Sequence, residues 1–292
     1  MTSEQTTSIS GPAPISAPAP IAAPAAPARR FRLPIDNRWL PPLFITSILV
    51  AAHFSFGILV GWAPIAVAIG VAIAAEVVAS RLTHGKWPQP SSAYISGISV
   101  GILVRSPFLW PFALASLISI LTKYVLRWRG RHLWNPSNFG VSALLFLAPG
   151  TATVLSIQWG NNIWPMVVIW ALGFVIVWRV GRLHISVAYV LAFVAFSLVR
   201  SAITGNPWLA TLAPITGPMY QLFIFFMITD PKTTVRSKRG QVLTVVAVAF
   251  VEMLLRLNEV IYAPFYALFL VGPVALLFET WLASRRAAAP AR

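Results

Sequence analysis

Acidic residues are rare in this sequence, and one of the seven lies where a long apolar run ends. The stretch FFMITDPKTT (225–234) places Asp230 between Thr229 and Thr233. A carboxylate and two hydroxyls near the carbonyl end of a helix supply the oxygen ligands that a hard cation prefers. The same groups are able to hold a neighbouring loop instead, and a solvated Asp-Pro turn is the structural alternative. We therefore treat these three residues as candidates for an ion pathway.

A second polar stretch, GRHLWNPSNFG (130–140), predicts the start of a helix. Asn135 is a good N-cap residue, and Pro136 suits the first helical position, where the missing N–H costs nothing. Arg131 and His132 precede this helix end. Unpaired backbone N–H groups beside basic side chains are suited to a phosphate or to the polar edge of a flavin. The alternative is a capped short helix whose basic flank only sets its orientation in a membrane.

Titratable residues also interrupt the apolar runs themselves, where they are costly and functional by default until a partner is found. His53 lies in the middle of such a run, where its ring is able to carry a proton or to hold an electron carrier, and a satisfied interhelical hydrogen bond is the alternative. Glu76 has no cation three or four residues further on, so it requires a partner from another helix, a bound ion or a proton. Glu252 has Arg256 four residues later, and we expect a local ion pair there.

The composition is that of an integral membrane protein. Apolar residues make up 58% of the chain and charged residues only 10%, against roughly 25% charged residues in ordinary soluble domains. There is no cysteine, so a thiolate metal site and a protein-held iron–sulfur cluster are excluded, and any redox centre must be a bound cofactor. Paired metal-binding histidines and a serine elbow are also absent, and we expect neither catalytic residues nor a metal site. The basic residues lie in short gaps between apolar runs, which argues against nucleic acid as a partner.

The apolar runs have the length of membrane spans. About 20 helical residues cross roughly 30 Å of hydrocarbon. Placing both termini in the cytoplasm puts 19 of the 22 Lys and Arg residues on that side, as the positive-inside rule requires. We predict ten hydrophobic segments, at 42–61, 64–82, 91–104, 108–127, 136–148, 163–180, 183–200, 209–229, 240–257 and 262–283.

Two of these segments, 91–104 and 136–148, are too short to cross a bilayer as plain helices and therefore predict half-helices. Tilted short spans are the alternative. The segments divide into five and five, at about 42–150 and 160–284, and an odd number per half inverts the second half relative to the first. Inverted repeats with broken helices form ligand sites where the halves meet. A break in the eighth segment is predicted by Pro214, Gly217 and Pro218.

The expected organisation is thus an all-α membrane domain at 41–284 with two flanking segments. A Pro/Ala-rich stretch at 1–40 cannot form a packed core and is expected to be a disordered cytoplasmic arm. Its positive charges follow the Pro/Ala tract instead of preceding an apolar run, so we do not expect a signal peptide. Residues 285–292 are expected to form a basic cytoplasmic tail.

Three stretches of the sequence resemble the RnfD/NqrB family of membrane subunits. FFMITDP is similar to the family signature FFMATDP, GRHLWNPSNFG is similar to its NPA half-helix segment, and SGISVGILVRSP (96–107) lies where the family has its third span. The ordered set covers roughly residues 42 to 283. The resemblance implies ten spans in two inverted halves, and a subunit of a flavin-dependent electron-transport complex that moves Na⁺ or H⁺ across the bacterial inner membrane. It also implies other membrane and peripheral subunits as partners.

The resemblance further implies flavin contacts near the half-helices. The family attaches one flavin to the threonine of an S-G-A-T loop, and that tetrapeptide is absent here, so we expect FMN or riboflavin to be held noncovalently. The expected cofactor contacts are Ser96, Gly97, Arg131, Asn135, Pro136, Asn138, Gly140, Thr216 and Gly217. The expected ion pathway comprises His53, Glu76, Thr229, Asp230 and Thr233. The alternative function is a stand-alone transporter, export or accessory membrane protein that uses the same scaffold without redox chemistry.

Overall fold

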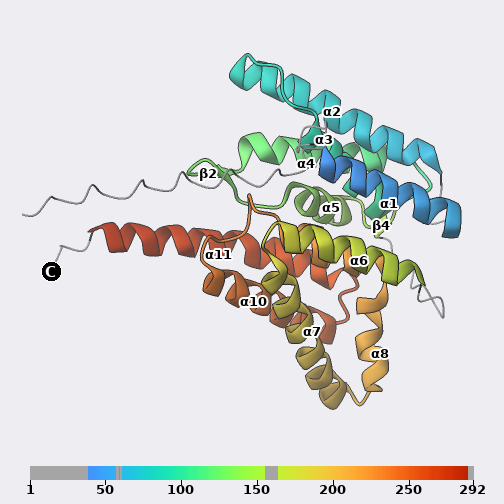
Figure 1. Cartoon of the computed structure of the whole chain (residues 1–292), viewed down its shortest axis with the longest axis vertical. Helices are drawn as coiled ribbons and strands as arrows, with labels where there is room; N and C mark the ends of the chain where they lie inside the picture. The colour runs from blue at the N-terminus through green and yellow to red at the C-terminus, as the bar shows by residue number, and fades with distance from the viewer. Residues whose placement is uncertain (1–38, 57–58, 60, 155–163, 289–292) are drawn as a thin grey trace, which may run out of the picture. The chain divides into compact units, whose positions relative to one another are not determined.

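The computed structural model describes residues 39–56, 59, 61–154 and 164–288, all within one compact unit, Asn37–Arg292. Nearly all of the predicted arm at 1–40 and residues 289–292 of the predicted tail lie outside these residues. The described part of the tail is helical, because α11 continues to Ala288. Helices form most of the structure, as Figure 1 shows.

Every predicted hydrophobic segment contains helix. The first half holds α1 (Leu40–Phe56), α2 (Trp62–His84), α3 (Ser91–Leu103), α4 (Trp110–Val125) and α5 (Pro136–Leu147). The second half holds α6 (Trp164–Arg179), α7 (Leu183–Thr204), α8 (Trp208–Leu212), η1 (Ala213–Thr216), α9 (Pro218–Leu222), η2 (Phe223–Met227), α10 (Lys238–Leu257) and α11 (Ala263–Ala288). Short antiparallel pairs join β1 (Val104–Arg105) to β4 (Thr153–Val154) and β2 (Arg127–Trp128) to β3 (Arg131–His132).

The protein is an all-α membrane protein. In the described residues, α2, α7, α10 and α11 are long and apolar enough to cross a bilayer, and a fifth span exists if the bent α8–η2 segment counts as one. The remaining apolar helices are shorter. With 13 and 12 residues, α3 and α5 rise less than the roughly 30 Å of a hydrocarbon core, as the half-helix prediction requires. Helix length and composition alone thus support four or five spans.

The eighth segment is broken where the sequence predicted. The helices on either side of the break are bent by 64° relative to one another. Pro214 lies in the 3₁₀ turn η1, and the extended backbone of Gly217 (φ −77°, ψ 150°) precedes α9. The chain then continues as the π-helix η2, which ends just before the turn that contains Asp230. A proline interrupts the helical hydrogen-bond ladder, and this accounts for the break.

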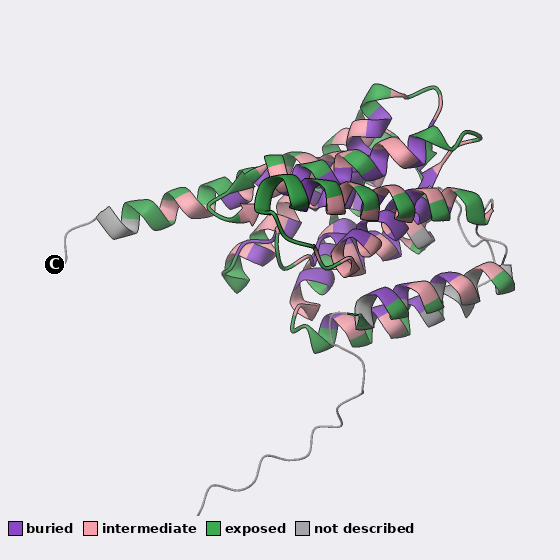
Figure 2. Cartoon of the chain, turned by 90° about the horizontal axis from the view of Figure 1, so that it is seen from above, coloured by how far each residue is buried: buried purple, intermediate pink, exposed green. Residues whose placement is uncertain are grey.

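Packing within each half follows a similar order. In the first half, α2 packs on α4 and α4 packs on α5, whereas in the second half α7 packs on α10 and α10 packs on α11. Buried residues line the contacts between these helices, and many outward faces stay exposed, as Figure 2 shows. The exposed set includes large apolar side chains such as Leu82, Trp178 and Leu191. Apolar outward faces suit a lipid environment.

Two glycines allow the short helices to approach their neighbours closely. A Cβ on Gly97 of α3 would lie 2.7 Å from the Ala68 carbonyl oxygen of α2. A Cβ on Gly140 of α5 would lie 2.0 Å from Ser119 Oγ of α4. Any larger residue therefore forces these helices apart. The close contacts fix the positions of the helix starts at Ser91 and Asn135.

Candidate functional site

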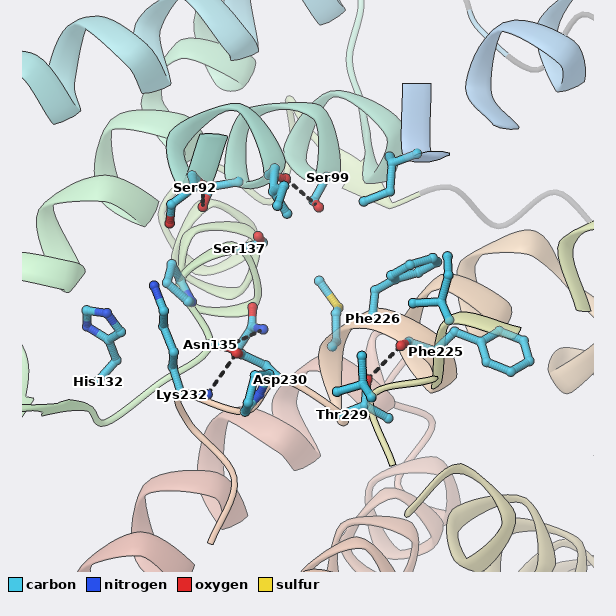
Figure 3. Close-up of a pocket in the computed structure, with 18 of the residues that line it drawn as sticks. Ser92, Ser99, His132, Asn135, Ser137, Phe225, Phe226, Thr229, Asp230 and Lys232 are labelled. Atoms are coloured by element: carbon cyan, nitrogen blue, oxygen red, sulfur yellow. Dashed lines mark hydrogen bonds between the residues drawn. The ribbon is translucent and has the colours of Figure 1, made fainter. Parts of the chain in front are cut away.

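A cavity of about 390 Å³ lies where the two short helices begin. It extends between the N-terminal turns of α3 and α5, one face of α6 and the turn that follows η2. In Figure 3, His132 and Lys232 lie on one side of the cavity and Phe225 and Phe226 on the other. The cavity is lined by Ile45, Ser91, Ser92, Ile95, Ser96, Ser99, Lys123, His132, Asn135, Pro136, Ser137, Ile176, Val177, Val180, Arg182, Phe225, Phe226, Met227, Thr229, Asp230, Pro231 and Lys232.

Asn135 joins the start of α5 to the turn after η2. Its Oδ1 accepts a hydrogen bond from the backbone N–H of Asn138 at 3.1 Å, which caps the helix as the sequence predicted. Its Nδ2 donates to Asp230 Oδ2 at 3.3 Å. Asp230 also accepts from the backbone N–H of Lys232 at 3.0 Å and from Thr233 Oγ1 at 3.2 Å. Asp230 therefore holds this loop against the helix end, the second role that its position suggested.

Glu76 finds its partner on another helix. Lys123 Nζ of α4 lies 3.2 Å from Glu76 Oε2 of α2, and only 6% and 12% of the two side chains are exposed. Lys123 also donates to the carbonyl and hydroxyl oxygens of Ser92 at 3.3 and 3.2 Å, and Tyr124 donates to Glu76 Oε1 at 3.0 Å. The cluster ties α2, α3 and α4 together beside the cavity. The first of the three explanations for Glu76, a partner from another helix, is confirmed.

The cavity has a basic and hydroxyl-rich wall. Lys123, Arg182 and Lys232 line it, and Asp230 is the single carboxylate among the lining residues. Five serine hydroxyls lie along the same walls, those of Ser91, Ser92, Ser96, Ser99 and Ser137. Most of the other lining residues have aliphatic or aromatic side chains. This arrangement suits a ligand with an apolar body and a polar or anionic edge.

Two lining residues carry buried atoms without a hydrogen-bond partner among the described residues. These atoms are Nδ1 of His132 and Nη1 of Arg182. Burial lowers the pKa of His132, and the nearby charges of Lys232 and Arg127 lower it further. Burial and these charges both favour the neutral form of the ring. Because an unpaired buried polar atom is costly, both atoms indicate space for a ligand or for water.

The structure brings several of the predicted site residues together. Ser96, Asn135, Pro136, Thr229 and Asp230 line the cavity, and Thr233 contacts it through Asp230. Glu76 reaches it through Lys123. The basic lining residues Lys123, Arg182 and Lys232 were not predicted as site residues, because the sequence analysis used Lys and Arg only for membrane orientation. Their convergence depends on contacts between α4 and two distant turns.

Other predicted contacts lie away from the cavity. Gly97 and Gly140 lie where two helices approach each other closely. Asn138 is buried, with Nδ2 donating to the Phe265 carbonyl at 3.2 Å and Oδ1 unpaired among the described residues. Arg131 pairs with Glu279 at 3.2 Å and is not among the cavity-lining residues.

Three more predicted site residues, Thr216, Gly217 and His53, also lie outside the cavity lining. Thr216 is exposed and donates to the Ala213 carbonyl at 2.7 Å, and Gly217 starts α9. His53 Nδ1 accepts from the backbone N–H of Leu59 at 3.3 Å, and its ring contacts Trp62 edge-on. This bond is local, because Leu59 lies just after the end of α1, and it is therefore not the interhelical hydrogen bond that was one alternative for His53.

A second buried cluster occupies the other half of the protein. Glu252 pairs with Arg256 at 3.0 Å, as the four-residue spacing predicted. It also accepts hydrogen bonds from Tyr189 at 2.5 Å and from Tyr220, and Arg256 contacts Tyr220 as well. Only 1% of the Glu252 side chain is exposed. The two tyrosines come from α7 and α9, so the cluster joins three helical segments.

Comparison with known proteins leaves the family open. No protein-family model matches the chain, and no curated protein sequence matches it either. Among the described residues, no three His, Asp or Glu side chains are grouped as a metal site. Fold and site together define an all-α membrane protein with an amphipathic cavity at the ends of two short helices.

Proposed function

We propose that this protein is a membrane subunit of a flavin-dependent electron-transport complex coupled to Na⁺ or H⁺ translocation. In this proposal FMN or riboflavin is held noncovalently in the cavity. The observation that carries the proposal is the mixed lining, in which Phe225 and Phe226 lie on the side away from His132 and Lys232 and five serines also line the cavity. The resemblance of the same stretches to the RnfD/NqrB family favours this ligand over others of similar shape.

The residues fit the chemistry of a flavin ring. Such a ring has broad apolar faces, a hydrogen-bonding edge, and a reduction potential that depends on charge near that edge. The apolar residues are suited to contact the faces. Serine hydroxyls and Asn135 supply hydrogen-bonding groups, and Lys123 and Lys232 supply positive charge. His132 Nδ1 and Arg182 Nη1 are further groups that a polar edge would satisfy.

The proposed architecture is ten spans in two inverted five-helix halves, with both termini in the cytoplasm of a bacterial cell. Two features support it, namely the shared packing order of α2–α4–α5 and α7–α10–α11, and the lack of a plain full-length helix in the third segment of each half, which is the short α3 in the first half and the bent α8–η2 segment in the second. The sequence has no cysteine to hold a cluster, so partner subunits must supply and accept the electrons. Glu76 and the Thr229–Thr233 turn are the proposed ion-pathway residues nearest to the cavity.

A second candidate function is a stand-alone transporter or export protein. The observation in its favour is the break between η1 and α9, because interrupted helices at a central site are typical of transporters. The electron-transport proposal predicts the visible absorbance of a flavin in the purified protein, released in free form by denaturant. Colourless protein that carries ions or solutes across liposome membranes would identify the transporter instead.

A further inference from the structure

A second hollow adjoins the candidate cavity and has a different character. Its volume is about 480 Å³, and three helix connections form it: the turn after α4, the turn between α6 and α7, and the turn after η2. Its lining consists of Arg127, Gly130, Arg131, His132, Arg182, Pro231, Lys232, Thr234, Val235 and Arg236. We call it the basic vestibule. It shares His132, Arg182, Pro231 and Lys232 with the candidate cavity, so the two spaces are adjacent.

The basic vestibule carries a strong excess of positive charge. Five Arg and Lys residues line it, and no Asp or Glu residue is among the lining residues. Glu279 neutralises Arg131 from outside the lining, and it also accepts the backbone N–H of Arg236 at 2.6 Å. Arg182 and Lys232 form no ion pair with a carboxylate in the described part of the chain. Their charge is available to a ligand.

Two residues with unpaired buried atoms line both spaces. His132 Nδ1 and Arg182 Nη1 are buried and have no partner among the described residues. A guanidinium group normally uses its planar N–H groups in pairs, and phosphate oxygens match that geometry. Lys232 is exposed, and its side chain lines both spaces. An anion at this boundary would satisfy the unpaired guanidinium N–H group and offset the local charge.

We infer that the basic vestibule binds a phosphate group through Arg182, Lys232 and His132. The adjacent apolar wall of the candidate cavity then accepts the body of a phosphorylated ligand. The phosphate belongs either to a phospholipid head group or to a soluble phosphate compound. This inference goes beyond the proposed function, because it requires no redox chemistry.

Binding of a phosphate is expected to draw a proton onto His132. The charged groups around its ring are Lys123 of α4, Arg127 of β2, Asp230 and Lys232 of the turn after η2, and Arg182 before α7. Cations predominate in this set, and together with burial they keep the ring neutral. A phosphate dianion beside the ring reverses that balance and favours the charged imidazolium. Phosphate binding near pH 7 is therefore coupled to proton uptake.

Isothermal titration of the full chain with inorganic phosphate tests this inference. The protein is purified in detergent, stripped of phospholipid and held at constant ionic strength in buffers of different ionisation enthalpy. Wild-type protein is expected to bind phosphate saturably and to take up protons. Arg182→Gln and Lys232→Gln are each expected to weaken binding by roughly ten- to a hundredfold. The exposed neighbours supply matched controls, Arg179→Gln and Lys238→Gln, which are expected to bind like wild type.

His132→Gln distinguishes proton uptake from anion binding. It is expected to bind phosphate saturably but more weakly than wild type, through Arg182 and Lys232, and to lose proton uptake. Circular dichroism and size-exclusion profiles identify variants that fail to fold. Wild-type protein without saturable binding would overturn the inference, and so would equal affinities in folded Arg182→Gln and Arg179→Gln.

Competition with bound phosphate identifies the source of the group. Displacement by short-chain phosphatidic acid but not by phosphatidylcholine of equal chain length assigns the site to an anionic lipid. Displacement by FMN but not by riboflavin assigns it to a soluble phosphate compound. Displacement by riboflavin as strong as displacement by FMN would contradict a phosphate site. A colourless protein that binds phosphate would refute the flavin proposal and leave this inference standing.

Discussion

Replacement of Lys123 by methionine tests whether the buried ion pair beside the cavity holds its helices together. Methionine fills a similar volume without charge. Glu76 would then keep only the hydrogen bond from Tyr124 and lose its cation at 3.2 Å. Because the carboxylate is only 12% exposed, water cannot replace the lost partner efficiently.

The magnitude follows from the burial of both groups. Removing one partner of a buried ion pair costs about 3–5 kcal/mol, because the other charge is left uncompensated. A loss of this size lowers the melting temperature of a protein of 150–250 residues by about 6–20 °C. Removing both charges, with Glu76→Gln added to Lys123→Met, is expected to restore most of the lost stability. Lys86→Met is the matched control, since Lys86 is exposed near the end of the adjoining helix.

Thermal unfolding of the purified variants in one detergent measures the effect. The order of melting temperatures is expected to be wild type and Lys86→Met highest, the double variant close below them, and Lys123→Met lowest. A single variant as stable as the Lys86→Met control would refute the argument. A double variant less stable than Lys123→Met would also refute it, because removal of the unpaired Glu76 charge would then have brought no gain in stability.

Three further predictions use the same measurements of stability. Gly140→Ala is expected to cost about 1–3 kcal/mol, because its Cβ would overlap a neighbouring helix, whereas Gly70→Ala, with nothing within 4 Å, is expected to be neutral or stabilising; equal melting temperatures for the two would contradict this. Tyr220→Phe removes a hydrogen-bond donor to the buried carboxylate of Glu252 and is expected to lower the free energy of unfolding by about 1.5–3 kcal/mol. Chemical unfolding against wild type measures this loss, and an unchanged unfolding midpoint would argue against a stabilising role for this hydrogen bond. Burial holds the pKa of folded His132 below its unfolded value of about 6.5, so the free energy of unfolding is expected to fall as the pH drops below that value. The fall is expected to be smaller in His132→Gln. Parallel pH profiles of stability for the two proteins would disprove a lowered pKa of His132.

Local features of the fold were predictable from the sequence because local physics decides them. Long apolar runs gave helices, Asn135 and Pro136 started α5, and Pro214 marked the break in the eighth segment. Each signal depends on neighbours within one or two turns of helix. The ion pair between Glu252 and Arg256 is predictable for the same reason, since both lie on one helix.

The composition of the site was harder to predict because it depends on tertiary contacts. Lys123 lies 47 residues from its partner Glu76, and the two meet only because α2 packs on α4. Lys232 and Arg182 approach each other from different helix connections. Basic residues at helix ends are also what membrane orientation requires, so position alone did not separate the two roles.

Glycines near the short helices presented a similar ambiguity. A small residue serves either a ligand or a close helix contact, and the sequence cannot distinguish the two. The structure places Gly97 and Gly140 at helix contacts. Neither glycine is among the cavity-lining residues, so these two predicted cofactor contacts are not part of the site.

The most direct test of the central claim is a titration of the purified protein with FMN and riboflavin, followed by flavin fluorescence. Ser99 lines the cavity, so the ring introduced by Ser99→Phe would fill part of it, whereas Ser284→Phe adds the same ring to an exposed position on α11. We predict saturable quenching at one site in wild type and Ser284→Phe, with loss of that site in Ser99→Phe. Equal binding by the two folded variants, or no binding by wild type, would contradict the account.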